Sequence, residues 1–248
     1  PEAFAASWFS LHDEANRSVI EDEIELIDGR YIKRFSAQIR DADDRYFGRL
    51  HLLEDITEQK SASEALRRHD AIMHAVSVAA DRFLKEPDWK AQMDEVLGRF
   101  GRATDVSGVY VFENVTDPTT GNLTYSRRWG WHVEGIDDLK GWNIPYSMVL
   151  RWHEELAAGR PIVGLVRDLP DAERDYLEPL QVQSIAIVPI FVHQQRWGFI
   201  GFDERRRERV WSPAEVEALQ AAASIIGSAI LRTMNEEIYR NPVEHSPV

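Results

Sequence analysis

Residues 183–211, QSIAIVPIFVHQQRWGFIGFDERRRERVW, decide the fold that the sequence predicts. Residues 184–192 are apolar and rich in β-branched side chains, which is typical of a strand buried on both faces. A three-residue polar break follows, short enough for a hairpin loop. Residues 196–203 then return as a second strand, in which Gly198 and Gly201 permit close backbone approach. The sequence therefore predicts an antiparallel hairpin here.

A long helix is predicted directly after this hairpin. Ser212 suits the N-cap, Pro213 the first helical position and Glu215 the third, which completes a capping box. Strand, tight turn, strand and capped helix form the closing unit of an antiparallel α+β domain. Apolar positions recur along this helix in two heptad rows: Val216, Ala223, Ile230 and Leu219, Ile226, Thr233.

Residues 184–230 resemble the C-terminal half of a GAF domain, as found in bacterial sensor kinases and cyclases. The resemblance is specific because the last two strands, the Trp211-Ser212-Pro213 junction and the final helix agree together, and it extends upstream to about Ala71. It implies an antiparallel sheet with helices on both faces. We assign residues 71–240 to this GAF domain with its long exit helix.

Composition excludes several classes of protein. The net charge of −13 argues against a nucleic-acid or anionic-membrane partner, because either needs a basic surface. No run approaches the roughly 18 apolar residues of a membrane span. The absence of cysteine fits a cytoplasmic protein and excludes disulfides, thiolate metal sites and thioether-linked chromophores. We interpret the chain, which begins at Pro1, as a piece of a longer protein.

The N-terminal region predicts a three-stranded meander. Residues 23–27 alternate, Asp28-Gly29 is a strong hairpin signal, and two more strands follow up to residue 53. This meander and the triplet Asp55-Ile56-Thr57 resemble the C-terminal half of a PAS domain, in which such a triplet passes the signal to an output helix. We assign residues 1–56 to it. The N-terminal half of that family has no counterpart here, so no flavin or haem is expected.

Residues 57–84 predict a helical connector that runs into the GAF domain. Two heptad rows mark it: Leu66, Met73, Ala80 and His69, Val76, Phe83. We expect this helix and the exit helix to pack in a parallel homodimer. Residues 241–248, NPVEHSPV, resemble the first residues of another PAS domain, which would make the parent protein PAS–GAF–PAS.

No catalytic constellation is present. The eight histidines show no metal-ligand spacing, and no nucleophile elbow or phosphate-binding glycine loop occurs. The phosphoacceptor box of histidine kinases and the GGDEF and EAL signatures of cyclic-di-GMP enzymes are missing as well. We therefore predict that this chain is not itself an enzyme and carries no metal or cofactor.

Large aromatic side chains predict a ligand pocket. If strand side chains alternate through residues 122–133, Trp129 and Trp131 share one face with Tyr125 and Arg127. In the GAF family, the following loop and helix cover the sheet and enclose a small-molecule cavity. The candidate ligand-binding residues share large rings in this region: Trp129, Trp131, Trp142, Tyr146 and Trp152. The alternative is that these rings fill the space and leave no cavity.

Two further patterns are weaker evidence of function. Residues 199–204, FIGFDE, match the second half of the cyclic-nucleotide GAF signature, but the Asn-Lys dipeptide of its first half occurs nowhere. The basic run of residues 205–209 is interpreted as a solvated loop.

The prediction is a sensory region of a sensor histidine kinase, or alternatively of a diguanylate cyclase. Its GAF domain would sense a small ligand or relay a change in helix packing. The main competing hypothesis is a dimerisation scaffold with no small-molecule ligand.

Overall fold

A computed structural model describes residues 14–86, 88–118, 121–136 and 143–240. The chain divides into two compact units, residues 1–64 and 65–248. The fold class is α+β, as the sequence predicts: a small three-stranded sheet in the first unit and a larger antiparallel sheet with helices in the second.

The first unit is the predicted antiparallel meander. It consists of β1 (Ile20–Glu25), β2 (Tyr31–Arg40) and β3 (Tyr46–Asp55), in that order across the sheet. The Asp28-Gly29 turn forms as expected: Gly29 has φ +83°, and its N–H donates to the Leu26 carbonyl over 3.0 Å. The long helix α2 (Thr57–Lys85) begins in this unit and continues into the second. The assignment of the three-stranded meander to the PAS family stays a prediction.

The second unit is built on a six-stranded antiparallel sheet with the order β6-β5-β4-β9-β8-β7. Its strands are β4 (Gly108–Thr116), β5 (Leu123–His132), β6 (Asn143–Pro145), β7 (Ile162–Leu165), β8 (Ser184–Val192) and β9 (Gln195–Glu204). Its helices, besides α2, are α3 (Trp89–Thr104), α4 (Leu150–Ala157), α5 (Asp171–Leu177) and α6 (Pro213–Arg240), with the 3₁₀ turns η1 (Tyr146–Met148), η2 (Val166–Asp168) and η3 (Glu178–Leu180).

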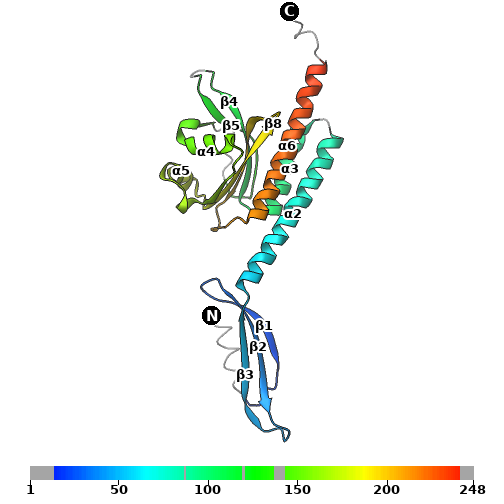
Figure 1. The fold of residues 1–248 in the computed structure, drawn as a ribbon, viewed down its shortest axis with the longest axis vertical. Helices are drawn as coiled ribbons and strands as arrows, with labels where there is room; N and C mark the ends of the chain where they lie inside the picture. The colour runs from blue at the N-terminus through cyan, green and yellow to red at the C-terminus, as the bar shows by residue number, and fades with distance from the viewer. Residues whose placement is uncertain (1–13, 87, 119–120, 137–142, 241–248) are drawn as a thin grey trace, which may run out of the picture. The chain divides into compact units, whose positions relative to one another are not determined.

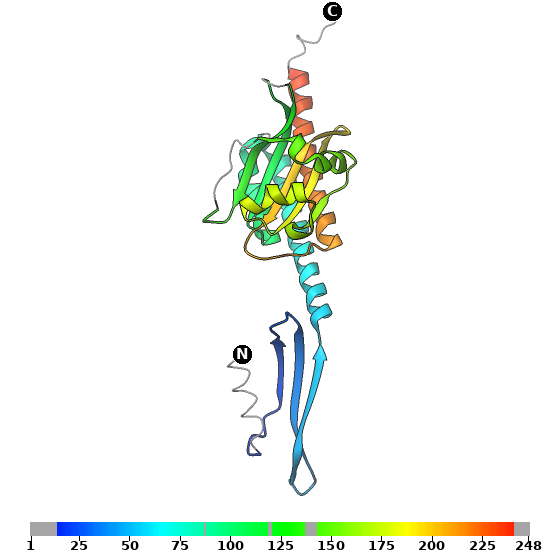
Figure 2. The ribbon, with the colours of Figure 1, turned by 90° about the vertical axis from the view of Figure 1, so that its left-hand side faces the viewer.

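Helices cover both faces of this sheet. Helices α2, α3 and α6 lie on one face, and α4 and α5 lie on the other (Figure 1). Figure 2 shows α4 and α5 from the front, with the strands behind them. Each face has its own apolar core, and the larger of the two lies under α2, α3 and α6.

The hairpin of β8 and β9 forms as predicted. Its two loop residues, His193 and Gln194, have φ +53° and +62°, which suits a tight two-residue connection. Gly198 is needed for pairing, because a Cβ there would lie 2.0 Å from the Phe112 carbonyl oxygen on β4. The capping box of α6 also forms. Glu215 N–H donates to Ser212 Oγ over 3.2 Å, and Ser212 N–H donates to Glu215 Oε2 over 2.9 Å.

The heptad rows of α6 do not form a free seam. Leu219, Ala223, Ile226 and Ile230 are almost completely buried in the core between α6 and the sheet. On α2, Val76 and Phe83 are buried in the same core. A helix that packs on a sheet repeats apolar residues at nearly the spacing of a coiled coil, so the sequence pattern alone does not distinguish the two.

Helix α6 is also apolar and long enough over Pro213–Glu237 to cross a membrane. That criterion uses length and composition only, and core helices satisfy it too. Half of its most apolar window is buried inside the unit.

Candidate functional site

A cavity lies between the sheet and the covering layer of α4 and α5. Its volume is about 70 Å³. The walls are mostly aromatic and aliphatic, and the rings that line it are Tyr110, Phe112, Trp152, Tyr176 and Phe199. On the sheet side, Phe112 and Phe199 stack on each other with their centroids 4.8 Å apart. The site is therefore apolar and suits a small organic molecule.

One end of the cavity is polar. Asp203 on β9 is 7% exposed, and its Oδ2 accepts from Arg205 Nε over 2.9 Å. Burial raises the pKa of Asp203, and the adjacent Arg205 only partly offsets that rise. Arg127 from β5 lines the same end, with its guanidinium 4.5 Å from the centroid of the Tyr110 ring.

In the lining, neither Asp203 Oδ1 nor the indole N–H of Trp152 on α4 has a hydrogen-bond partner among the described residues. Both side chains are buried, Trp152 at 2% exposed. Buried polar groups in folded proteins are nearly always hydrogen-bonded, so these two atoms are candidates for a hydrogen bond with a bound molecule.

Trp129 and Trp131 do not line this cavity, so their predicted position on its face is wrong. On the β4–β5 ladder Val111 pairs with Trp129, whereas Phe112 pairs with Arg127. Arg128 is therefore an extra, bulged residue, and its side chain pairs with Glu113 of β4 over 2.6 Å. A bulge reverses the alternation beyond it, which sends both tryptophans to the opposite face.

On that face the two tryptophans pack against α3. The Trp129 ring lies 5.1 Å from the ring of Trp89. Trp131 lies over Gly98 and Gly101, and a Cβ at Gly101 would come within 2.0 Å of its ring. These glycines have a packing role that the sequence reading missed. The spacing of the two glycines on the helix indicates this packing role only when Trp131 is known to face them.

The other predicted pocket residues fall in three places. Trp152 lines the cavity, and its ring makes an edge contact with Tyr176 at 6.0 Å. Tyr146 in η1 lies outside the lining and packs on Tyr125 at 4.2 Å. Trp142 lies outside the described residues. Ligand binding by any of them stays a prediction.

A second polar cluster centres on Arg196 at the start of β9. Its Nη1 donates to the Tyr125 hydroxyl over 2.8 Å, and its Nη2 lies 2.8 Å from His153 Nδ1 on α4. Burial and the charge of Arg196 lower the pKa of His153, so this imidazole is neutral at pH 7. The cluster ties the covering helix α4 to the sheet, and the sequence reading did not identify it.

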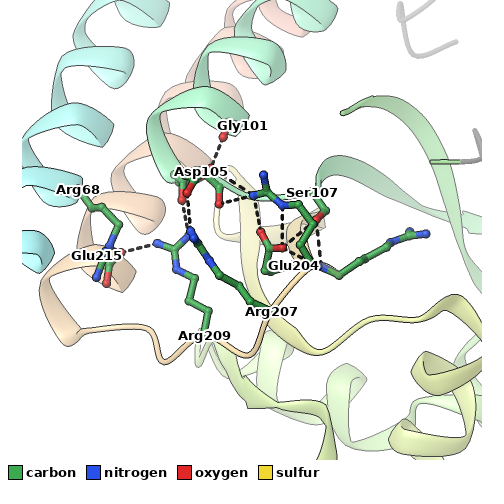
Figure 3. A network of polar contacts seen from close by, with 11 residues as sticks. Arg68, Gly101, Asp105, Ser107, Glu204, Arg207, Arg209 and Glu215 are labelled. Carbon is green, nitrogen blue, oxygen red and sulfur yellow. Dashed lines mark hydrogen bonds and ion pairs between the residues drawn. The ribbon is translucent and has the colours of Figure 1, made fainter. Parts of the chain in front are cut away.

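The basic run of residues 205–209 is a loop, as predicted, and residues 206–208 are exposed, but its arginines are held in ion pairs. Figure 3 shows its side chains in a network of ion pairs with Asp105, Glu204 and Glu215. Arg206 Nη2 lies 2.8 Å from Glu204 Oε2, and Arg209 Nη2 donates to Glu215 Oε1. Glu204, Glu215 and Arg209 are all buried. Glu204 and Glu215 are within six residues of their arginines, whereas Asp105 is about a hundred residues away and is not visible in the local charge pattern.

This network connects the cavity end of β9 to the long helices. Asp203 and Glu204 are neighbours on β9, so their side chains point to opposite faces of the strand. Glu204 Oε1 accepts from Ser107 Oγ over 3.0 Å beside the start of β4. Glu215 on α6 accepts from Arg68 Nε of α2 over 2.7 Å. A displacement at the end of β9 can therefore reach α2 and α6 through these polar contacts.

The predicted relay triplet forms a joint inside the first unit. Thr57 N–H donates to Asp55 Oδ1 over 3.0 Å, and Thr57 Oγ1 accepts from the Tyr31 N–H over 2.9 Å. Ile56 is buried, and its N–H donates to the Tyr31 carbonyl over 2.8 Å. These bonds fix the first turn of α2 to β2. Their role in signalling stays a prediction.

Within the described part of the chain, no group of three or more His, Cys, Asp or Glu side chains is arranged to hold a metal ion.

Comparison with known proteins gives one family match and several similar chains. The model of the GAF domain family matches residues 88–230. A curated relative, the methanogenesis regulatory histidine kinase FilI of Methanothrix harundinacea, is 38% identical over 202 residues. That alignment covers 79% of this chain but only 22% of the kinase, so the chain spans about a fifth of that relative.

Two solved structures share the fold. A phycoerythrobilin-bound GAF domain from a cyanobacterial phytochrome gives a TM-score of 0.58 at 15% identity, covering 68% of this chain and 97% of that one. The chromophore-binding domain of a Stigmatella aurantiaca bacteriophytochrome gives 0.57 at 16% identity, covering 88% of this chain and 74% of that one. At such identities the likeness concerns the fold alone.

Proposed function

The chain belongs to the GAF domain family, and we propose that it forms the sensory and regulatory region of a cytoplasmic histidine kinase. The kinase assignment draws on the relative that is 38% identical, and it is favoured over a diguanylate cyclase for that reason. In this proposal the chain itself does no chemistry. It binds a small molecule and passes the change in packing to an output domain elsewhere in the parent protein.

The cavity between the sheet and α4 and α5 is the observation that carries the sensing proposal. It is lined by aromatic rings, and Asp203 Oδ1 and Trp152 Nε1 of its lining are buried without partners among the described residues. Its volume of about 70 Å³ is about half of the roughly 150 Å³ of a cavity known to bind benzene. A larger ligand would therefore have to push α4 and α5 outward. Such a movement would reach the sheet through the Arg196 cluster, in which Arg196 of β9 contacts His153 of α4.

Thermal shift on a library of small aromatic compounds tests this proposal. A ligand stabilises the folded chain by mass action, so its melting temperature should rise with ligand concentration. Leu180→Trp, which fills the cavity wall, should abolish the rise. Leu231→Trp is the matched control on the opposite core, and it should retain the rise. A rise that persists in the Leu180→Trp variant would place binding elsewhere and reject this site.

We also propose that the output is a parallel homodimer that uses the surface side of α2 and α6. Leu66 and Met73 of the predicted heptad row are 61% and 39% exposed, unlike Val76 and Phe83. Between the two helices, Leu84 and Ile225 border a shallow apolar groove of about 170 Å³. Burying these side chains against a second copy would remove apolar surface from water.

The competing hypothesis is a scaffold that dimerises and binds nothing small. The small volume of the cavity favours it. A chain that dimerises normally but shows no thermal shift with any compound would decide for the scaffold.

A further inference from the structure

The two unsatisfied atoms of the cavity have opposite hydrogen-bonding character. Asp203 Oδ1 is an acceptor on the sheet side, while Trp152 Nε1 is a donor on α4. Asp203 keeps its other oxygen on Arg205, with Oδ2 2.8 Å from Arg205 Nη2, so its side chain is already oriented. A bound molecule that satisfies both atoms must present a donor to Asp203 and an acceptor to Trp152.

The remaining lining sets the body of that molecule. Phe112, Phe199 and Tyr176 offer ring faces and edges, and the other walls are aliphatic. Aromatic rings pack well against such walls in stacked or edge-to-face geometry. An apolar ring can therefore occupy the middle of the cavity, while its substituents reach the two polar atoms.

We propose that this cavity selects a single-ring hydroxyaromatic compound, whose hydroxyl donates to Asp203 Oδ1 and whose second, acceptor substituent receives the Trp152 N–H. The proposal rests on the proposed function, since it names the ligand class of the same site. The present volume of about 70 Å³ is smaller than the roughly 150 Å³ of a cavity known to bind benzene. Binding therefore requires α4, which carries Trp152, to move away from the sheet.

A matched pair of compounds tests the donor. 4-Hydroxybenzaldehyde has both groups, whereas 4-methoxybenzaldehyde keeps the acceptor and loses the donor. Calorimetric titration of the full chain should show the hydroxy compound binding at least about tenfold more tightly, because a hydrogen bond to a buried charged group is strong. Equal affinity of the two compounds overturns the proposal, yet leaves the sensing function standing.

The variant Asp203→Asn should reverse this preference. Its carbonyl oxygen can accept from Arg205, which leaves the amide N–H₂ as a donor in the place of Oδ1. The methoxy compound should then bind at least as well as the hydroxy compound. Glu113→Gln is the matched control, a carboxylate ion-paired with Arg128 on the same sheet but outside the lining, and it should keep the original preference. If Asp203→Asn does not fold, the compound pair on the unmodified chain decides alone.

Trp152→Phe tests the acceptor end. It keeps a ring in the wall but removes the N–H, so it should weaken 4-hydroxybenzaldehyde several-fold and leave phenol unchanged. Equal loss for both compounds would show a packing effect only and overturn that part of the proposal. If neither aldehyde binds while other library compounds bind in a manner sensitive to Leu180→Trp, the ligand class is wrong and the sensing site remains. If no compound binds at all, both proposals fail.

Discussion

Arg68 on α2 donates from Nε to Glu215 Oε1, at the third position of α6, over 2.7 Å. The two residues are 147 positions apart in the chain. Glu215 is completely buried and also binds the guanidinium of Arg209 and the backbone N–H of Ser212. One carboxylate thus joins the helix that leads into the domain, the loop after β9 and the helix that leads out.

Glu215→Ala should destabilise the second unit strongly. It leaves the buried Arg209 without its counterion, and removing one partner of a buried pair costs about 3–5 kcal/mol. Urea denaturation followed by circular dichroism measures the loss. Glu217→Ala, an exposed glutamate two positions later on the same helix, is the control and should change the free energy of unfolding by less than about 0.5 kcal/mol. Similar losses of unfolding free energy in the two variants would show that the Glu215–Arg209 pair makes no net contribution to stability.

Acid should weaken the domain through the same carboxylates. Burial works to raise the pKa of Glu215, but the Ser212 N–H and the charge of Arg209 outweigh it and hold that pKa below its usual 4.5. The pKa of Glu204 is lowered as well, because its bonds with Arg206 outweigh its burial. Since both folded-state pKa values lie below the unfolded ones, the unfolded chain takes up more protons as pH falls. This stabilisation is present above about pH 4.5 and is lost as pH falls through the folded-state values.

The urea midpoint measured from pH 7 down to pH 3 should therefore fall steeply below about pH 4.5. In Glu215→Gln, this acid limb should be shallower, because one of the carboxyl groups with a lowered folded-state pKa is gone. Glu217→Gln should keep the limb of the unmodified chain. An unchanged limb in Glu215→Gln would assign the acid sensitivity to other groups.

Gly101→Ala should be destabilising even though alanine favours helices. The new Cβ would stand 2.0 Å from the Trp131 ring, and overpacking of this kind costs about 1–3 kcal/mol. Gly98→Ala is the control: its Cβ would be 3.1 Å from the same ring, and the gain in helix propensity of about 1 kcal/mol offsets most of the crowding. Adding Trp131→Leu to Gly101→Ala should cost less than the sum of the two single changes. If the two destabilisations simply add, Gly101 and Trp131 are not in contact.

Met73→Glu should dissociate the proposed homodimer without unfolding the chain. Met73 is 39% exposed, so a charge there stays in water in the monomer but would be buried in a dimer. Multi-angle light scattering gives the mass, and a thermal melt gives the stability. Ile226→Glu is the contrasting variant, because Ile226 is fully buried against the sheet, and it should unfold the domain. A monomeric unmodified chain at high concentration would reject the dimer.

Local patterns predicted most of the fold. The β8–β9 hairpin, the Asp28-Gly29 turn and the Ser212–Glu215 capping box each depend on residues within a few positions of one another, and each is confirmed. The family match over residues 88–230 confirms the GAF resemblance that those elements suggested. Short-range backbone preferences and side-chain caps are visible in the sequence because both partners stand in the same window.

The candidate site was predicted only in part. The covering layer and the contribution of Trp152 followed from the resemblance, but the face of Trp129 and Trp131 depended on the single bulged residue Arg128. Nothing in the local pattern marks that bulge, because it is set by the register with β4. The unsatisfied Asp203 Oδ1 likewise appears only when the positions of all neighbouring groups are known.

The sequence by itself thus determined which helices and strands form, their order along the chain, and the family to which the chain belongs. Tertiary structure decided which face each side chain occupies and which charges meet. The basic run of residues 205–209 illustrates the reason: Arg206 and Arg207 bind Asp105, which is about a hundred residues away and reaches them only because the end of α3 lies beside the loop after β9. The apolar rows of α6 illustrate it again, since one periodic stripe serves a sheet or a partner helix, and only the fold shows that the sheet occupies it.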